Sequence, residues 1–170
     1  MLRSLVGSEM CIRDRLYRTN DYDQITQECN LADVIDQVCH ALSGYADNAH
    51  VTLIQKTTVY HYRGHVSSLQ RMLYNTIHNA IKFSLQGGQV VISLDSQGTC
   101  MVQDSGVGMN KEESSRMFDR FYQSDASRSS GQGSGLGMFL VSQIAQEHNI
   151  RVDVTSAIDQ GTTVIFDYGG

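Results

Sequence analysis

The 170-residue sequence is short of cysteine, positive charge and long apolar runs, and each shortage excludes a class of protein. Its four cysteines have no paired metal or redox spacing, which excludes a disulfide framework and suits reduced thiols. A net charge of -5 does not favour a nucleic acid or an anionic membrane as partner. Residues 1–15 hold no apolar stretch long enough for a signal peptide or a membrane span. We therefore expect a cytoplasmic domain that contacts neither nucleic acid nor membrane.

The rest of the composition fits one globular domain. Hydrophobic residues make up 41% of the chain, which is enough for one core. Apolar residues recur at helical spacing after Asn30, the predicted N-cap, then over residues 66–83, and again after Gly137. Strands are predicted over residues 51–56, 57–62, 89–94, 99–102, 150–155 and 162–168. The expected fold is α+β, a two-layer α/β sandwich in which one layer of about three helices covers one mixed, mostly antiparallel sheet.

A polar stripe runs along the helix predicted over residues 66–83. At about 100° per residue, Asn75, Asn79 and Lys82 fall within about 60° of one another, opposite an apolar face. Packing explains the apolar face, but it does not explain why two carboxamides and an ammonium group are aligned. Carboxamide oxygens suit a hard cation such as Mg²⁺, and a lysine suits a phosphate. The alternative interpretation is the solvated face of an ordinary amphipathic helix.

A glycine-rich stretch, residues 131–137, leads into a strongly apolar stretch of helical length. A helix that begins this way presents unpaired backbone N–H groups and the positive end of its dipole, and glycines let a phosphate approach closely. No Lys-Ser or Lys-Thr pair follows the glycines, which excludes a P-loop, and no strand immediately precedes them, which excludes a Rossmann motif. The alternative is a surface loop without a ligand.

A short turn after a predicted strand contains Asp104, Gly106 and Gly108. The carboxylate could accept a hydrogen bond from an exocyclic amine, and the glycines would let a flat ring lie against the backbone. A simple Asp-Ser-Gly turn would have the same composition, because Asp and Gly are common in turns. Residues 117–123 combine aromatic and charged side chains, which alone predicts only a partly buried amphipathic segment.

In order and spacing, these segments resemble the ATP-binding domain of sensor histidine kinases, within the GHKL ATPase superfamily. The resemblance covers residues 30–168 and implies the GHKL fold and the binding of ATP with Mg²⁺. Residues 75–84 resemble the N box, residues 104–109 the G1 box, residues 118–123 the F box, residues 133–138 the G2 box, and residues 159–163 the glycine-threonine segment that closes such domains.

The resemblance also implies roles for individual residues. The catalytic candidates are Asn79, which would coordinate Mg²⁺, Asn75, which would support the metal or the γ-phosphate, and Lys82, which would neutralise phosphate charge. Asp104 would read the adenine amine. The other nucleotide-binding candidates are Gly106, Gly108 and Met109 at the base, Phe121, Arg128 in a lid over residues 124–134, Gly133, Ser134, Gly135, Leu136 and Gly137 in the loop, and Thr162 and Thr163 beside the adenine. Lid anchoring and docking are the favoured roles for Phe118 and Phe121, and a solvated charge is the equal alternative for Arg128.

The family's reaction transfers the γ-phosphoryl group of ATP to a histidine on a dimerisation domain upstream, and the receiver domain of a response regulator is an indirect partner. In the family an acid and then a proline follow the acceptor histidine, and this sequence has no proline. His40 lacks both neighbours, and surface or supporting roles are favoured for His61, His65 and His78. We therefore expect the acceptor outside this chain. The alternatives are a binding-only regulatory ATP module and another GHKL ATPase, such as an anti-sigma-factor-type serine kinase.

Three parts are expected along the chain. Residues 1–20 belong to no domain, residues 21–29 form a polar linker, and residues 30–168 form the ATP-binding domain. Residues 1–15 show no usable periodicity and match none of the boxes. We interpret them as translated sequencing-adapter read-through, with the tail of the helical dimerisation domain as the alternative.

Overall fold

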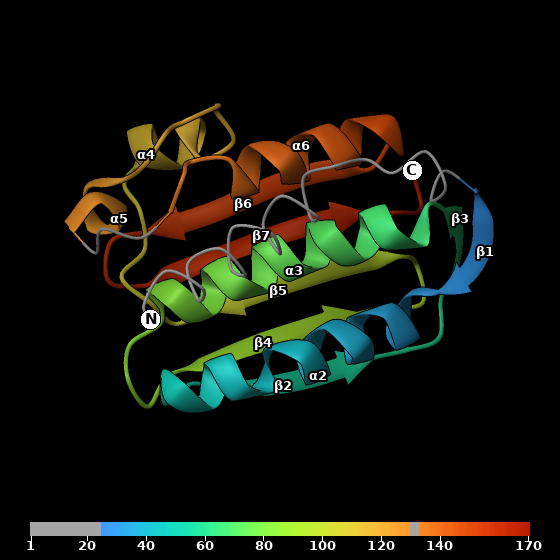
Figure 1. The fold of residues 1–170 in the computed structure, drawn as a ribbon, viewed down its shortest axis with the longest axis horizontal. Helices are drawn as coiled ribbons and strands as arrows, with labels where there is room; N and C mark the ends of the chain where they lie inside the picture. Colours follow the sequence, from blue (N-terminus) through green and yellow to red (C-terminus); the bar gives the residue numbers. More distant parts are fainter. Residues whose placement is uncertain (1–24, 130–132) are drawn as a thin grey trace, which may run out of the picture.

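The computed structural model describes residues 25–129 and 133–170, drawn in colour in Figure 1. The expectations for residues 1–20 and 21–24, and those for Gly131 and the neighbouring residues of the lid, concern parts of the chain outside these ranges. The described residues form a layer of helices packed on a sheet.

A five-stranded sheet makes one layer of the fold. In spatial order, its strands are β2 (Thr52–Thr57), β4 (Gln89–Leu94), β5 (Thr99–Asp104), β7 (Gly161–Asp167) and β6 (Arg151–Ala157). β2 runs parallel to β4, and every other neighbouring pair in this sheet is antiparallel. The prediction of a mixed, mostly antiparallel sheet is therefore confirmed.

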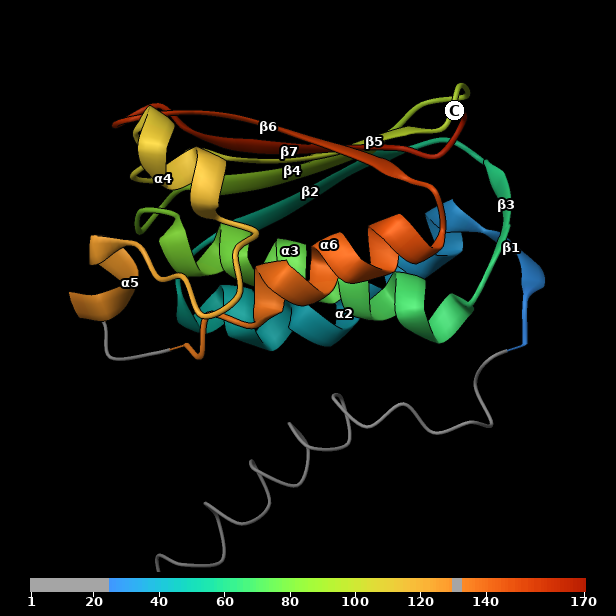
Figure 2. The same cartoon turned by 90° about the horizontal axis from the view of Figure 1, so that it is seen from above.

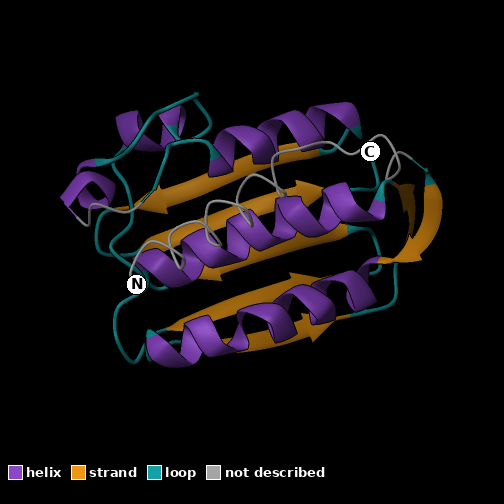
Figure 3. Ribbon diagram, viewed as in Figure 1, coloured by secondary structure: helices purple, strands orange, loops and turns teal. Residues whose placement is uncertain are grey.

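Three helices make the second layer. They are α2 (Leu31–Asn48), α3 (Val66–Phe83) and α6 (Gly137–Glu147), and they lie side by side on one face of the sheet (Figure 2). The described elements leave the opposite face of the sheet uncovered. Two short helices, α4 (Lys111–Arg116) and α5 (Asp125–Ser129), lie near the N-terminal end of α6 (Figure 3). The two-layer sandwich with three helices in its helical layer is confirmed.

The apolar pattern of α3 predicts both its ends and its rotation. Leu69, Leu73 and Ile77 are completely buried, and full burial of such a side chain contributes about 1.5–3 kcal/mol. Asn79 and Lys82, on the other side of the helix, are only partly buried. Because the apolar stripe is buried in the core, the polar stripe lies on a different side of the helix, where it is only partly buried.

The predicted cap of α2 is also present. The side chain of Asn30 accepts a hydrogen bond from the backbone N–H of Ala32 at 3.2 Å. The same oxygen also accepts a hydrogen bond from the backbone N–H of Tyr60 at 3.3 Å. The same side chain therefore caps the helix and joins it to the chain that follows β2.

A small ribbon at one end of the fold differs from the sequence-based expectation. β1 (Gln27–Asn30) pairs antiparallel with β3 (His61–Gly64), so residues 27–29 of the expected linker are part of the fold. The strand predicted over residues 57–62 is divided, because β2 continues to Thr57 and β3 begins only at His61. The ribbon is held by backbone pairing between short polar segments, which gives no clear alternation in the sequence.

Candidate functional site

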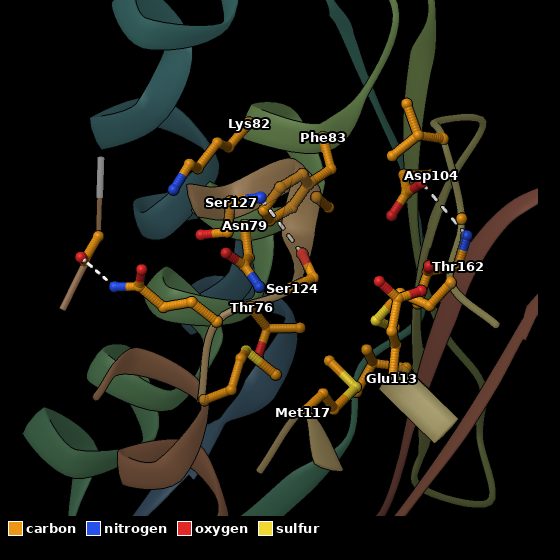
Figure 4. A pocket seen from close by; sticks show the side chains of 18 of the residues that line it. Thr76, Asn79, Lys82, Phe83, Asp104, Glu113, Met117, Ser124, Ser127 and Thr162 are labelled. Carbon is orange, nitrogen blue, oxygen red and sulfur yellow. Dashed lines mark hydrogen bonds between the residues drawn. The ribbon is translucent and has the colours of Figure 1, made fainter. Parts of the chain in front are cut away.

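A cavity of about 990 Å³, its open mouth included, lies between the C-terminal half of α3, the ends of β5 and β7, and the chain between α4 and α6 (Figure 4). It is therefore built from segments far apart in the sequence. Of the predicted site residues, those that line it are Asn79, Lys82, Asp104, Gly108, Met109, Gly133, Gly135 and Thr162.

The α3 wall carries the carboxamide and the ammonium group. Asn79 and Lys82 line the cavity on the stripe that the helical spacing predicts. A Cβ built on Gly133 would lie 3.2 Å from Lys82 Nζ, so the glycine-rich loop comes close to the ammonium group. The Lys82 ammonium also lies 5.2 Å from the centroid of the Phe83 ring. A negatively charged group in this part of the cavity would meet both a cation and loop backbone.

Asn75 does not line the cavity but lies beside it. Its Nδ2 donates a hydrogen bond to the backbone oxygen of Arg71 at 2.8 Å. A Cβ on Gly137, the first residue of α6, would lie 3.1 Å from Asn75 Oδ1. Asn75 is thus placed where α3 meets the beginning of α6, one turn before Asn79.

Asp104 places a buried carboxylate at the other end of the cavity. The residue is 7% exposed, and its Oδ1 accepts hydrogen bonds from the backbone N–H groups of Gly106 at 2.9 Å and Thr162 at 3.2 Å. In Figure 4 the other carboxylate oxygen points into the cavity. Burial raises the pKa of Asp104, and the two backbone hydrogen bonds partly offset the rise. Such a group recognises a hydrogen-bond donor with little competition from water.

The glycines of the Asp104 turn serve packing as well as ligand access. A Cβ on Gly106 would lie 2.0 Å from the backbone oxygen of Phe83, and one on Gly108 would lie 1.9 Å from that of Ala157. Gly108 also has a φ of 65°, which favours glycine. Only Gly108 lines the cavity, so Gly106 contributes by seating the turn against the end of α3.

The aromatic segment before α5 holds the glycine-rich loop. The backbone N–H of Phe121 donates to the oxygen of Gly135 at 2.9 Å, and the Gln123 side chain donates to the oxygen of Gly133. Phe121 itself has a φ of 64°, is 63% exposed and does not line the cavity, whereas its neighbour Tyr122 does. The contacts of Phe121 in this structure are those of a loop anchor.

The other predicted site residues lie around the cavity without lining it. Arg128 is exposed and faces Asp125 at 3.9 Å. Thr163 lies in β7, one residue beyond the cavity-lining Thr162. The predicted residues outside the cavity lining are Asn75, Gly106, Phe121, Arg128, Ser134, Leu136, Gly137 and Thr163.

Several lining residues were not predicted from the sequence. Glu113 lies in a capping box with Asn110, and their spacing of three residues is a signal that the sequence does contain. Met117 and Met138 add apolar, polarisable surface to that of Met109. The further unpredicted residues include Thr76, Val107, Tyr122, Gln123, Ser124 and Ser127. Most come from short connecting segments, in which no periodicity marks the inward side.

The cavity offers few ligands for a metal ion. Within the described ranges, no group of three or more His, Cys, Asp and Glu side chains could hold a metal ion. The Asn79 carboxamide is a neutral oxygen donor beside the Lys82 ammonium. This donor set fits Mg²⁺, which is commonly held by one or two protein oxygens together with substrate phosphates and water.

None of the six histidines, all of which lie in the described ranges, lines the cavity. His78 is stacked between two tyrosines, with its ring centroid 4.3 Å from that of Tyr45 and 5.9 Å from that of Tyr74. Across the same ranges, no helix is both long and apolar enough to cross a membrane.

Comparison with known proteins connects this geometry with a family. A model of histidine kinase-, DNA gyrase B- and HSP90-like ATPases matches residues 64–168. The chain is 38% identical over 101 residues to the sensor protein SrrB of Staphylococcus aureus. That match covers 57% of this chain and 17% of SrrB, so the chain spans only a small part of this relative's length.

Solved structures share the fold. The mycobacterial sensor histidine kinase MprB matches with a TM-score of 0.74 and 25% identity, over 84% of this chain and 95% of that chain. Full-length ShkA in complex with AMPPNP matches with a TM-score of 0.75 and 22% identity, over 92% of this chain and 33% of that chain. The ShkA likeness concerns the fold alone.

Proposed function

Because the chain belongs to the family of histidine kinase-, DNA gyrase B- and HSP90-like ATPases, we propose that residues 27–168 are the ATP-binding catalytic domain of a two-component sensor histidine kinase. One observation carries the proposal. Asn79 and Lys82 of α3 and the buried Asp104 of β5 line one cavity, beside a glycine-rich loop. The combination provides a donor-reading carboxylate at one end and a phosphate-binding wall at the other. The domain works in the cytoplasm, where ATP is available.

Asp104 selects adenine. Its Oδ1 is occupied by two backbone N–H groups, so the second oxygen accepts the hydrogen bond from the exocyclic amine. Guanine presents a carbonyl oxygen at the equivalent ring position, and two acceptors facing each other in a nearly closed site repel. Met109, Met117 and Met138 give the flat base an apolar surface.

The phosphates bind between α3 and the beginning of α6. Lys82 supplies positive charge, and the loop around Gly133 and Gly135 supplies backbone N–H groups. The N-terminal end of α6 adds the positive end of its helix dipole, and no acidic residue in its first turn offsets that charge. Arg128, which is exposed and paired only loosely with Asp125, is available to a phosphate when α5 moves toward the cavity.

Asn79 would hold magnesium, and Asn75 would support it from one turn earlier. When bound, the ion would neutralise phosphate charge. The chain contributes a carboxamide oxygen from Asn79, while Asn75 orders the junction between α3 and Gly137. Asn75, Asn79 and Lys82 therefore act together in placing the γ-phosphate.

The reaction transfers the γ-phosphoryl group to a histidine of the parent protein's dimerisation domain. The bond from the β,γ-bridging oxygen to the γ-phosphorus breaks, ADP leaves, and a phosphorus–nitrogen bond forms as the imidazole loses its proton. Such a transfer needs in-line positioning and charge neutralisation more than covalent help from the enzyme. The receiver domain of a response regulator is the subsequent acceptor.

A transfer assay tests the proposal. The purified chain is incubated with γ-labelled ATP, Mg²⁺ and a separately purified dimerisation domain of a sensor histidine kinase. The expected product is a label on that domain that acid removes and base does not, as for a phosphohistidine. An acid-stable label on serine would overturn the proposal in favour of a serine kinase. Binding of ATP without transfer to any histidine domain would overturn it in favour of a binding module.

A further inference from the structure

The imidazole of His148 joins the ends of α3 and α6 that lie farthest from the cavity. His148 directly follows α6, and its Nδ1 lies 2.8 Å from the backbone oxygen of Ile144. Its Nε2 lies 3.1 Å from the backbone nitrogen of His65, which is the N-cap of α3. One side chain therefore connects the last turn of α6 with the residue that begins α3. We refer to this arrangement, His148 with Ile144 and His65, as the His148 joint.

The partners determine which nitrogen carries the proton. A carbonyl oxygen only accepts, so Nδ1 must be the donor toward Ile144. A backbone N–H only donates, so Nε2 must be the acceptor from His65. The joint therefore requires the neutral Nδ1–H tautomer. A second proton on Nε2 would set one donor against another and break the bond to His65.

The surroundings fit the imidazole closely. A Cβ on Gly64 would lie 2.9 Å from His148 Cδ2, so only glycine leaves room for the ring at its present distance. The hydroxyl of Tyr62 donates to the backbone oxygen of His148 at 2.8 Å. β3 thus holds His148 from a second side, which keeps Nε2 directed at the start of α3.

The groups that surround the joint come from α3, α6 and the ribbon of β1 and β3. α3 has no acidic residue in its first turn, so no carboxylate there offsets the positive end of its dipole. The ring of His65 lies edge-on at 5.2 Å, and its Nε2 lies 3.0 Å from Thr26 Oγ1. Within the described ranges, the elements around the joint also carry the Tyr62 hydroxyl, the Cys29 thiol and Tyr168, both of which contact Tyr62, and the exposed Glu147 on α6. They carry two ion pairs as well, Arg151 with Asp167 and Glu28 with His61.

The joint and the nucleotide site lie at opposite ends of the same helix pair. α3 and α6 lie side by side (Figures 1 and 2), and they meet again where Asn75 approaches Gly137. Hydrogen-bonded helices of this length move largely as rigid bodies, so a displacement of α6 at His148 also moves its first residues relative to Asn79 and Lys82.

We propose that His148 is a positioning residue for nucleotide binding: its neutral imidazole holds α6 in register with α3, and protonation releases α6 and weakens binding. The inference rests on the proposed function, because it concerns how well the two helices present the phosphate site. Imidazole is the side chain that ordinarily changes charge between about pH 5 and 8, which sets the pH range to compare.

The test compares the pH dependence of affinity in three chains. Affinity for AMPPNP with Mg²⁺ is measured at about pH 7.5 and about pH 5.5 for the wild type, His148→Gln and His65→Ala. Glutamine offers an oxygen to the His65 N–H and does not titrate. His65→Ala removes a second imidazole but keeps the backbone donor. Protonation of AMPPNP affects the three chains equally, so it cancels when their affinity ratios between the two pH values are compared.

The wild type should lose about three- to tenfold more affinity on acidification than His148→Gln, which corresponds to the loss of one hydrogen bond. His65→Ala should respond to pH as the wild type does. Nitrogen NMR of the wild-type imidazoles gives a readout that needs neither nucleotide nor a variant, and it should report the Nδ1–H tautomer for His148 at neutral pH.

Two results would overturn the inference while leaving the proposed function intact. They are the same pH response in the wild type and His148→Gln, and an Nε2–H tautomer of His148 at neutral pH. No binding of AMPPNP at any pH would instead contradict the proposed function, and the role of the joint in binding with it.

Discussion

Asp104 is a carboxylate placed where ionisation is costly. It is 7% exposed, and the two backbone N–H groups on its Oδ1 compensate only part of the cost of burial, so its pKa is raised. Asn79 and Lys82, by contrast, are half-buried polar groups on the wall of an open cavity. Among single residues, the site therefore combines one buried carboxylate, to which we assign base specificity, with partly buried polar groups, to which we assign phosphate affinity.

Replacing Asp104 with asparagine separates recognition from folding. In Asp104→Asn, Oδ1 still accepts from Gly106 and Thr162, but an amide N–H₂ replaces the oxygen that faces the base. Affinity for ATP should fall about 10- to 100-fold, because hydrogen bonds to charged groups contribute about 1.5–3 kcal/mol. Competition binding against GTP checks this, and an unchanged preference for ATP would refute the role of Asp104.

The same variant tests the energetic cost of the carboxylate. Because the folded-state pKa of Asp104 is raised, the folded chain binds this proton more readily than the unfolded chain does. Ionised Asp104 therefore lowers the free energy of unfolding. This loss of stability is complete above the folded-state pKa and absent below the unfolded-state pKa. Asp104→Asn should melt no lower than the wild type at pH 7, and any gain should shrink toward about pH 4. A melting temperature several degrees below that of the wild type at pH 7 would contradict this account.

Asn79→Ala removes a cavity-lining carboxamide from the end of the cavity where we propose that the phosphates bind. Magnesium-dependent binding of ATP should be lost, because no cluster of acidic or histidine side chains in the described ranges could replace the ligand. Isothermal titration with and without Mg²⁺ measures the effect. Gln70→Ala is a control on the same helix. Gln70 donates to Gln37 at 2.7 Å and does not line the cavity, so this variant should bind ATP as the wild type does.

The elements differ in how far the sequence predicts them. α3 is predicted with both its ends, because its buried stripe repeats over the whole helix. β1 is not predicted, because its pairing with β3 is a backbone interaction between polar segments. The segment from α4 to α6 is the least predictable. Met117 and Tyr122 reach the cavity from connecting segments, and Ser127 reaches it from the five-residue helix α5, which is too short to show a period. The boxes in this segment identify the family, but they do not show which side chains face inward.

The glycine-rich loop depends on backbone conformations that other residues do not readily adopt. Gly135 has a φ of 70°, and a Cβ there would lie 2.6 Å from the backbone carbon of Phe121. Gly135→Ala should break the hydrogen bond from Phe121 N–H to the Gly135 oxygen and lower nucleotide affinity at least about tenfold. The melting temperature should change little, because strain of about 1–3 kcal/mol falls on the loop.

Gly44→Ala is the control for that substitution. Gly44 lies inside α2 with nothing within 4 Å of an added Cβ, so alanine should raise stability by about 0.5–1 kcal/mol and leave nucleotide affinity unchanged. Thermal melting and isothermal titration of both variants make the comparison. Equal affinities of Gly135→Ala and the wild type would contradict the role given to the loop conformation.

In the whole molecule, the packing of the helical layer determines which side chains face the cavity. Burial of their apolar faces against one side of the sheet directs the polar stripe of α3 into the cavity, and α6 starts beside it (Figure 2). The layer order, the mixed sheet and the residues at both ends of the cavity could be predicted, because each follows from a repeating pattern or from a motif. The His148 joint could not, because His65 and His148 lie 83 residues apart and meet only when the chain has folded.

We propose that one cavity binds adenine at Asp104 and magnesium-bound phosphates at Asn79 and Lys82. The most direct test is isothermal titration of the purified chain with AMPPNP, with and without Mg²⁺, and with a GTP analogue as control. We expect one site per chain, binding that depends on magnesium, and a clear preference for the adenine nucleotide. No binding, or equal binding of the two nucleotides, would contradict it.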